Sequence, residues 1–179
     1  MIIETERLII RDLTLEDVDD LFEYCSNPVM DPFITFPIHQ TNYQTKSFVE
    51  YVINKNDAGK DFTVGITLKE SNKVIGTIDI GNINELHHFG ELAYAINPNY
   101  WNKGYATEAA EAILDYGFQQ KGLNRIFARC VLHNIGSEKV MQKIRMKYEG
   151  VQRHGLLIKG KYQDLRVYAI LKGDWLQKG

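Results

Sequence analysis

One segment limits the folds open to this chain more than any other: an apolar strand, a tight turn and a long helix follow one another between residues 89 and 120. A strand is predicted over residues 89–96, a turn over 97–100, and a helix from 104 to about 120, with its apolar residues on one face. The first N–H groups of a helix have no partner within it, and the helix dipole places about half a positive charge there. The segment therefore predicts an anion-binding site at the start of this helix, where Gly104 has no Cβ to keep an anion from the backbone.

Short strands and amphipathic helices account for most of the remaining sequence, without a repeat or a Pro/Gly/Ser-rich linker. Thr14 is placed to cap a first helix, and the stretch from 27 to 43, with three of the four prolines, is expected to be irregular. Three consecutive strands followed by strand, helix and strand favour a mixed, largely antiparallel sheet with helices on its faces. The predicted strands are residues 7–13, 62–68, 73–81, 89–96, 125–131, 147–155 and 165–171, and the other predicted helices are 44–56 and 136–144.

Length and composition indicate one domain over residues 1–179, because 179 residues with 44% apolar side chains suffice for one core. The near balance of 21 Lys and Arg against 23 Asp and Glu gives no basic footprint for nucleic acid. The sequence shows no signal peptide and no apolar run of roughly 18 residues, which predicts a cytoplasmic protein without a membrane partner. Cys25 and Cys130 stand outside any CxxC or Cys/His spacing, so no metal site is predicted.

The loop before the long helix carries a specific resemblance. WNKGYA, at residues 101–106, resembles the [Gln/Arg]-x-x-Gly-x-[Gly/Ala] loop that binds the pyrophosphate of coenzyme A in the GCN5-related N-acetyltransferase (GNAT) superfamily. This version of the loop is similar to that of the RimJ/RimL branch of ribosomal-protein N-acetyltransferases. Further matches follow the family's order along the chain: residues 5–11, Asn134-x-x-Ser137 followed by Lys143, and residues 164–175.

The resemblance implies an α+β fold with a central mixed, mostly antiparallel sheet of six to seven strands and about four flanking helices. Its fourth and fifth strands splay apart, and the thioester of acetyl-CoA enters the gap. The implied activity is direct transfer of an acetyl group from acetyl-CoA to a primary amine. The acceptor is a protein N-terminal α-amine, as in the RimJ/RimL branch, or a small amine such as a polyamine or an amine-bearing antibiotic. A non-catalytic acyl-CoA-binding sensor or interaction module is the alternative, and a monomer and a homodimer both remain open.

The resemblance also assigns the cofactor site. Backbone N–H groups of the strand end are expected to align the pantetheine amides, and Lys103 can add a charge for the phosphates. Asn134 either contacts the pantetheine arm or simply caps the helix that starts near Gly136. The expected cofactor-binding residues are Tyr94, Ala95, Ile96, Trp101, Asn102, Lys103, Gly104, Tyr105, Ala106, Thr107 and Asn134.

Two residues are candidates for the proton transfers that acetylation requires. Glu91 is a carboxylate within an apolar strand one strand length before the cofactor loop, so it is the candidate base, unless it lies on the solvent face. Many members of the family have a tyrosine acid seven residues after the asparagine of the second motif, where this chain has Met141. Ser137 is then the candidate proton donor, or an ordinary residue of the first helical turn.

The acceptor is expected to meet the irregular stretch and the last hairpin, and the candidate residues are Phe33, Tyr162 and Asp164. The chain departs from the family at three positions. Trp101 replaces the Gln or Arg of the superfamily, as is common in this branch. Asn102 stands where the branch usually has Gly, which predicts a stiffer loop. Arg145 also replaces a usual Gly, at a helix end where a side chain resists the left-handed conformation.

Overall fold

A computed structural model of the protein describes residues 2–57 and 62–177. Within these residues one eight-stranded sheet has the order β1-β2-β3-β4-β5-β6-β8-β7. Every neighbouring pair is antiparallel except β5 and β6, which run parallel. The strands are β1 (Ile2–Glu4), β2 (Leu8–Arg11), β3 (Phe62–Leu68), β4 (Val74–Asn84), β5 (Phe89–Ile96), β6 (Arg125–Val131), β7 (Lys147–Ile158) and β8 (Lys161–Leu171).

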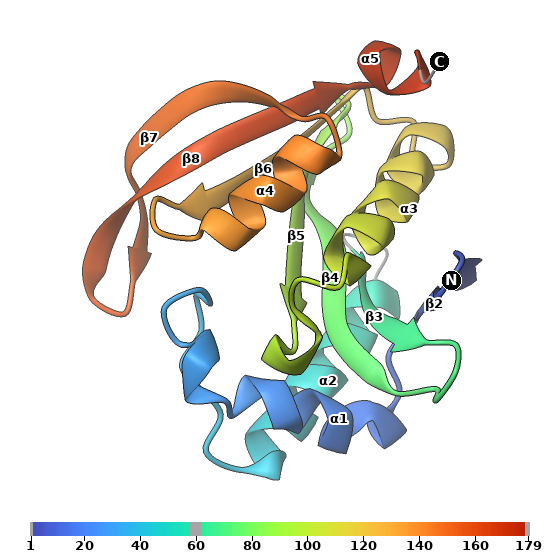
Figure 1. Ribbon diagram of the computed structural model, residues 1–179, viewed down its shortest axis with the longest axis vertical. Helices are drawn as coiled ribbons and strands as arrows, with labels where there is room; N and C mark the ends of the chain where they lie inside the picture. Colours follow the sequence, from blue (N-terminus) through green and yellow to red (C-terminus); the bar gives the residue numbers. More distant parts are fainter. Residues whose placement is uncertain (1, 58–61, 178–179) are drawn as a thin grey trace.

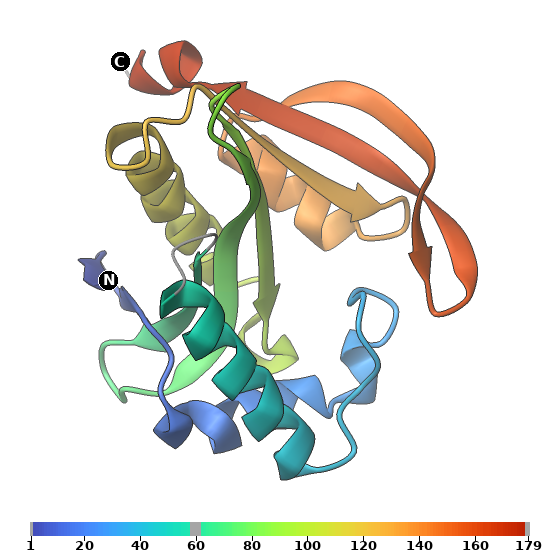
Figure 2. The same cartoon turned by 180° about the vertical axis from the view of Figure 1, so that it is seen from behind.

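Helices cover both faces of the sheet. The larger core lies between the sheet and the pair α3 and α4, and the smaller core lies under α1 and α2 on the other face. Figure 1 shows α3 and α4 on the near face, and Figure 2 shows α2 lying across the opposite face. The helices are α1 (Val18–Cys25), α2 (Asn42–Asp57), α3 (Tyr105–Gln119), α4 (Ile135–Lys143) and α5 (Lys172–Leu176), with short turns η1 (Leu15–Asp17), η2 (Pro28–Met30) and η3 (Pro98–Tyr100).

The two halves of the sheet separate between β5 and β6. Their pairing covers only Phe89–Glu91 against Arg125–Phe127. From Leu92 onward β5 pairs with β4 on one edge, whereas on its other edge β6 has turned away toward β8. Figure 1 shows the two halves diverging from their common end near α5. The expected splay of the fourth and fifth predicted strands is thus confirmed, one strand later in the numbering because β1 precedes them.

The predicted mixed, mostly antiparallel sheet with flanking helices is confirmed, with differences in detail. The sheet has eight strands instead of six or seven, because the short β1 pairs with β2. The last hairpin is longer than predicted, because Lys159 and Gly160 both take positive φ values, 48° and 78°, and turn β7 directly into β8. The first helix begins with a turn of 3₁₀ helix, η1, before α1.

The end of α4 keeps the left-handed conformation despite the arginine. Arg145 has φ 64°, as a glycine would at this place. Its guanidinium lies 5.0 Å from the centroid of the Trp175 ring, and Nη2 donates to the Trp175 carbonyl at 3.2 Å. These two contacts hold the Arg145 side chain against α5 while its backbone keeps the left-handed conformation.

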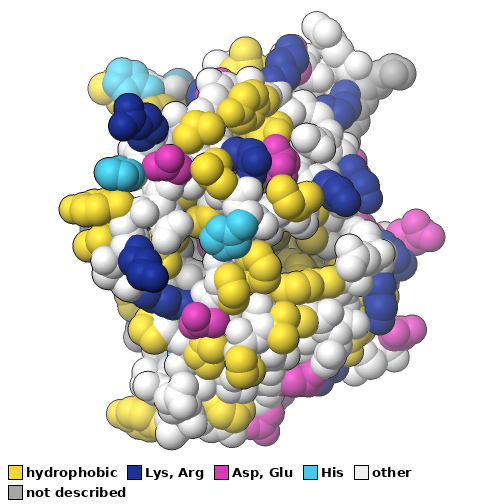
Figure 3. All heavy atoms as spheres, turned by 60° about the vertical axis from the view of Figure 1, so that its left-hand side comes forward, with side chains coloured by type: hydrophobic (Ala, Val, Ile, Leu, Met, Phe, Trp, Pro, Cys, Tyr) yellow, Lys and Arg dark blue, Asp and Glu magenta, His cyan; other side chains and the backbone are white. Residues whose placement is uncertain are grey.

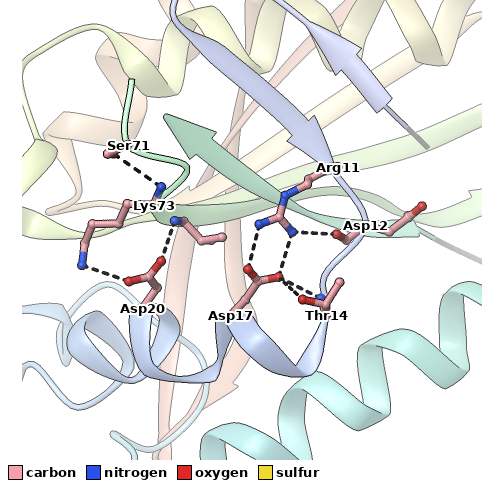
Figure 4. Close-up of polar contacts among 8 residues, drawn as sticks. Arg11, Asp12, Thr14, Asp17, Asp20, Ser71 and Lys73 are labelled. Carbon is pink, nitrogen blue, oxygen red and sulfur yellow. Dashed lines mark hydrogen bonds and ion pairs between the residues drawn. The ribbon is translucent and has the colours of Figure 1, made fainter. Parts of the chain in front are cut away.

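An ion pair fixes the start of the helical segment that leads to the site. Arg11 donates to both oxygens of Asp17 at 2.8 Å, and the Thr14 N–H donates to the same carboxylate at 2.8 Å (Figure 4). The Asp17 side chain is only 6% exposed. Burial raises the pKa of Asp17, but the hydrogen bonds from Arg11 and Thr14 outweigh it and set the pKa below its ordinary value. Asp20, one turn later, accepts from Lys73 and from the N–H of Val74, which ties α1 to the start of β4.

Asp17→Asn is expected to lower the free energy of unfolding by roughly 2–3 kcal/mol at pH 7, because it leaves the Arg11 guanidinium without its counter-charge. A carboxylate whose pKa is lowered by folding stabilises the protein above its unfolded pKa, near 4, and loses this effect as the pH falls through the folded pKa. The difference between the two proteins in urea unfolding should therefore be largest at pH 7 and shrink toward pH 3.

Asp19→Asn is the matched control, because Asp19 is exposed and accepts only one side-chain hydrogen bond, from Asn42 Nδ2, in the part of the chain described. It should change stability by less than about 0.5 kcal/mol. An equal cost of Asp17→Asn at pH 7 and pH 3 would show that the pKa of Asp17 is not lowered in the folded protein.

Candidate active site

The loop between β5 and α3 is held in one shape by its own residues. The Trp101 indole N–H donates to the Ile96 carbonyl at 2.7 Å, which folds the loop back on the strand end. Asn102 and Gly104 take left-handed conformations, with φ 61° and 85°, and Gly104 is the N-cap residue of α3. Asparagine tolerates this region better than most side chains, so Asn102 is accommodated. The loop leaves the first amides of α3 directed outward, as an anion site needs.

The turn between β1 and β2 fixes the start of α3 from the side. Glu108 accepts hydrogen bonds from Thr5 Oγ1 at 2.6 Å and from the N–H and Nε of Arg7 at 2.8 and 2.7 Å. Arg7 also donates to the Lys103 carbonyl at 3.0 Å and lies over the Tyr105 ring at 4.4 Å. Burial raises the pKa of Glu108, but these hydrogen bonds outweigh it, so the pKa lies below its ordinary value. The carboxylate is therefore ionised at neutral pH and holds the loop by charge-assisted bonds.

Across the gap between the sheet halves, β5 and α4 meet through two hydroxyl groups. Tyr94 Oη lies 2.9 Å from Ser137 Oγ and donates to the Ser137 carbonyl at 3.1 Å. Asn134 caps α4, because its Oδ1 accepts from the Ser137 N–H at 3.0 Å. Burial raises the pKa of Tyr94 above its ordinary value, so the phenol keeps its proton at neutral pH. The arrangement is a chain of two neutral hydroxyls beside the open edge of β5.

One cavity of about 520 Å³ joins these parts. Figure 3 shows hydrophobic side chains gathered round a hollow, with histidine and basic side chains near its edge. The cavity contains all the expected cofactor-binding residues except Lys103, together with Ser137 and Phe33. The lining residues are Met30, Phe33, Ile34, Tyr94, Ala95, Ile96, Tyr100, Trp101, Asn102, Gly104, Tyr105, Ala106, Thr107, His133, Asn134, Ile135, Gly136, Ser137, Lys139, Val140 and Lys143.

Glu91, the candidate base, lies outside this cavity. Its Oε1 accepts from Arg129 Nε at 2.7 Å, and its Oε2 accepts from Arg129 Nη2 at 2.9 Å and from Asn82 Nδ2 at 2.7 Å. The carboxylate is 14% exposed and borders a separate, open hollow between β5, β6 and β7. Its position joins β5 to β6 at the last paired residues of the two strands.

Three other candidates also lie away from the cavity. The Lys103 ammonium lies 5.2 Å from the centroid of the Tyr100 ring. Tyr162 is 65% exposed and stacks on His154, with ring centroids 5.4 Å apart. Asp164 accepts from the His154 N–H at 2.8 Å, which holds the hairpin. Phe33 is therefore the one expected acceptor residue that the structure brings to the cavity among the described residues.

The cavity also contains residues that the sequence did not single out. Lys139 and Lys143 lie one turn apart on α4, and their i, i+4 spacing could have indicated a shared face. His133 directly precedes the second cofactor motif, and Met30 and Ile34 come from the irregular stretch. Nothing in the local sequence indicated that these last three would meet the cofactor loop.

The cysteines and the other polar clusters add no further chemistry. Cys25 and Cys130 are free and buried, and burial raises their pKa values to about 12 and about 11. Within residues 2–57 and 62–177, no three His, Cys, Asp or Glu side chains gather in a way that could hold a metal ion. Nor does any helix in the same residues have the length and apolarity to cross a membrane.

A sheet opened beside a helix N-terminus, with an adjoining hydroxyl pair and lysines, fits the coenzyme-A site that the sequence resemblance implies. Residues 7–147 match the family model described as the acetyltransferase (GNAT) domain, so the chain belongs to the GNAT acetyltransferases. The N-acetyltransferase YnaD of Bacillus subtilis is 38% identical over 179 residues, covering 98% of this chain and 99% of its own.

Solved structures of acetyltransferases have the same fold as this protein. A GNAT-family acetyltransferase from Bacillus anthracis has a TM-score of 0.85 at 35% identity, over 97% of this chain and 99% of its own. RimL, a ribosomal α-N-protein acetyltransferase in complex with coenzyme A, has a TM-score of 0.85 at 18% identity, over 96% and 98%. The protein is an N-acetyltransferase, and acetyl-CoA is its acetyl donor.

Lys139→Ala and Lys143→Ala are each expected to weaken acetyl-CoA binding by roughly fivefold to twentyfold, or about 1–2 kcal/mol, because both line the cavity beside the anion site. The loss should shrink as salt is raised. Titration calorimetry with acetyl-CoA measures the dissociation constants.

Lys103→Ala is the matched control, since its ammonium lies over Tyr100 and outside the cavity lining. It should weaken binding by less than about twofold. A loss at Lys103 as large as that at Lys139 and Lys143 would place the phosphate charge on the loop rather than on α4.

Proposed function

We propose that the acceptor of this N-acetyltransferase is the α-amine of a peptide or protein N-terminus. The observation that carries the proposal is the composition of the part of the cavity lined by the loop between α1 and α2, which we call the cavity mouth. Met30, Phe33 and Ile34 form its wall, and His133 completes it. No carboxylate is found among the described residues that line the cavity. A polyamine carries several cationic amines and needs acidic partners, whereas a peptide terminus presents a single amine beside an apolar or small side chain.

The nearest acidic side chains on either side of the mouth already have cationic partners. Asp31, beside the loop residues, pairs with Lys159 Nζ at 2.5 Å. Glu138, on α4, pairs with Arg166 Nε at 3.2 Å and accepts from the Tyr168 hydroxyl at 2.8 Å. The charge of each carboxylate is thus already balanced by a cation of this chain, which lessens its attraction for a polyamine. The likeness in fold to RimL, which is named for α-N-protein acetylation, supports the same acceptor class.

The residues of the cavity have separate tasks in this proposal. Acetyl-CoA supplies the acetyl group as a thioester. The amides at the start of α3, with Lys139 and Lys143, hold its phosphates, and the open edge of β5 aligns the pantetheine amides. Ser137 Oγ gives a proton to the departing sulfur, and Tyr94 Oη, 2.9 Å away, restores it. The raised pKa of Tyr94 keeps the second hydroxyl protonated until it is needed.

Release of free thiol from acetyl-CoA, measured against a panel of amines, tests the acceptor class. Peptides with a free α-amine should be acetylated with kcat/KM at least about tenfold above that of spermidine or an aminoglycoside, a difference of about 1.4 kcal/mol. The control peptide has the same sequence with a blocked N-terminus and one internal lysine. A preference for spermidine, or equal rates with the blocked peptide, would contradict the proposed acceptor.

Ser137→Ala is expected to lower kcat by roughly 10²-fold, because the leaving sulfur loses its proton donor. Tyr94→Phe should lower kcat less, by about tenfold, since Ser137 keeps its own hydroxyl. Both variants should bind acetyl-CoA within about twofold of the wild type. Thr45→Val, which removes a buried hydroxyl from the other core, is the control and should keep its rate. Full activity of both site variants would remove the hydroxyl pair from the mechanism.

A further inference from the structure

We propose that His133 is the general base that takes a proton from the acceptor amine. The inference rests on the amine acetylation proposed above. It names a proton acceptor inside the cavity, which Glu91 does not provide because it lies outside. The ionisable groups that line the cavity are His133, two lysines and three tyrosines. Among these side chains an imidazole is the one whose neutral form has both an N–H donor and a ring nitrogen with a lone pair that can accept a proton.

Glu91 is poorly placed for this task. Both carboxylate oxygens already accept hydrogen bonds from Arg129, and one accepts a third from Asn82. Protonation of Glu91 would break a bidentate pair and leave the Arg129 side chain, 19% exposed, without its counter-charge. The carboxylate also borders the hollow on β5, β6 and β7 instead of the cavity that holds Ser137.

The surroundings of His133 fix which ring nitrogen is basic. Nε2 lies 3.1 Å from the Pro32 carbonyl oxygen. A carbonyl can only accept, so Nε2 carries the hydrogen and Nδ1 of the neutral ring carries the lone pair. The ring also packs near Phe33, with centroids 6.0 Å apart, and Phe33 meets the edge of Trp101 at 5.7 Å. The loop between α1 and α2, here called the acceptor loop, thus orients the imidazole through Pro32, and Phe33 of the same loop connects it to Trp101 of the cofactor loop.

Charged groups from three other segments lie near His133. Lys139 lies on α4, which begins two residues after His133, and Arg166 of β8 donates to the carbonyl of the preceding residue, Leu132. From the acceptor loop, Asp31 is paired with Lys159 of the hairpin. His133 itself is exposed, so a proton on the ring can pass to water after each turnover.

The proton balance is complete without another reactant. One proton of the acceptor ammonium moves to Nδ1, and the freed lone pair forms the new C–N bond while the C–S bond breaks. The sulfur takes a proton from Ser137, which regains one from Tyr94, and the second proton of the acylated nitrogen returns through solvent to Tyr94. His133 releases the first proton to solvent. The products are the amide, the free thiol and one proton.

His133→Ala is expected to lower kcat/KM by roughly 10²-fold for the best acceptor of the panel, with acetyl-CoA binding within about twofold of the wild type. Added imidazole should restore part of the rate, because it can occupy the space left by the ring and accept the proton. A structural role alone would give no such rescue. Ser137→Ala, which lacks a different group, should gain nothing from imidazole.

Two matched variants complete the experiment. His39→Ala removes a histidine that bonds to Thr45 away from the cavity and should keep the wild-type rate. Glu91→Gln should lose less activity than His133→Ala. The proposal is overturned if His133→Ala keeps its rate, if imidazole fails to relieve its loss, or if Glu91→Gln shows the larger loss. If the wild-type enzyme prefers a small amine to peptides, the proposed acceptor class is wrong. The His133 variants are then assayed with that amine, and the test of the base is unchanged.

Discussion

The divergence of β5 from β6 is the constraint on which the site depends. Parallel pairing ends at Glu91 and Phe127, and the strand beyond has a backbone edge without a neighbouring strand among the described residues. Such an edge is a ready partner for an extended chain with amide groups, which is what the pantetheine arm provides. The bidentate pair of Glu91 and Arg129 lies at the point of separation, so it joins the strands where their pairing stops. Glu91, the candidate base in the sequence, therefore has the position of a residue that links β5 to β6.

Residues far from the anion site in the sequence hold its loop and helix start in place through hydrogen bonds. Glu108 anchors the first turn of α3 to the turn between β1 and β2 through Thr5 and Arg7. On the other side, Asn97 is fully buried and donates to Glu23 at 3.0 Å, while its oxygen accepts from the Asn99 N–H. These bonds fix the turn before the loop and the helix after it. A site with this geometry before binding loses less conformational entropy when the coenzyme binds.

The parts of the site that could be predicted are those that depend on contiguous residues. The loop at 101–106 and the strand–turn–helix around it are local, and so is the cap of α4 by Asn134. The direction of Glu91 depends on Arg129, 38 positions later, and that of His133 depends on the Pro32 carbonyl, 101 positions earlier. No local pattern carries that information. The hairpin turn at Lys159 and Gly160 was missed for a related reason, since a lysine gives no turn signal of its own.

The two walls of the cavity are built from interactions of different strength. The coenzyme wall rests on several charge-assisted bonds to one carboxylate, that of Glu108, and on the left-handed Gly104, so changes there disturb the loop and the start of α3. The acceptor wall is held by the Lys159–Asp31 pair and the His133–Pro32 bond, both exposed, and an exposed ion pair is worth about 1 kcal/mol or less. Asp31, Pro32 and Phe33 are not buried, so they can be replaced with less loss of stability than Met30 and Ile34, which belong to the smaller core. This difference explains, in physical terms, how one acetyl-CoA site can serve different amines within a single fold.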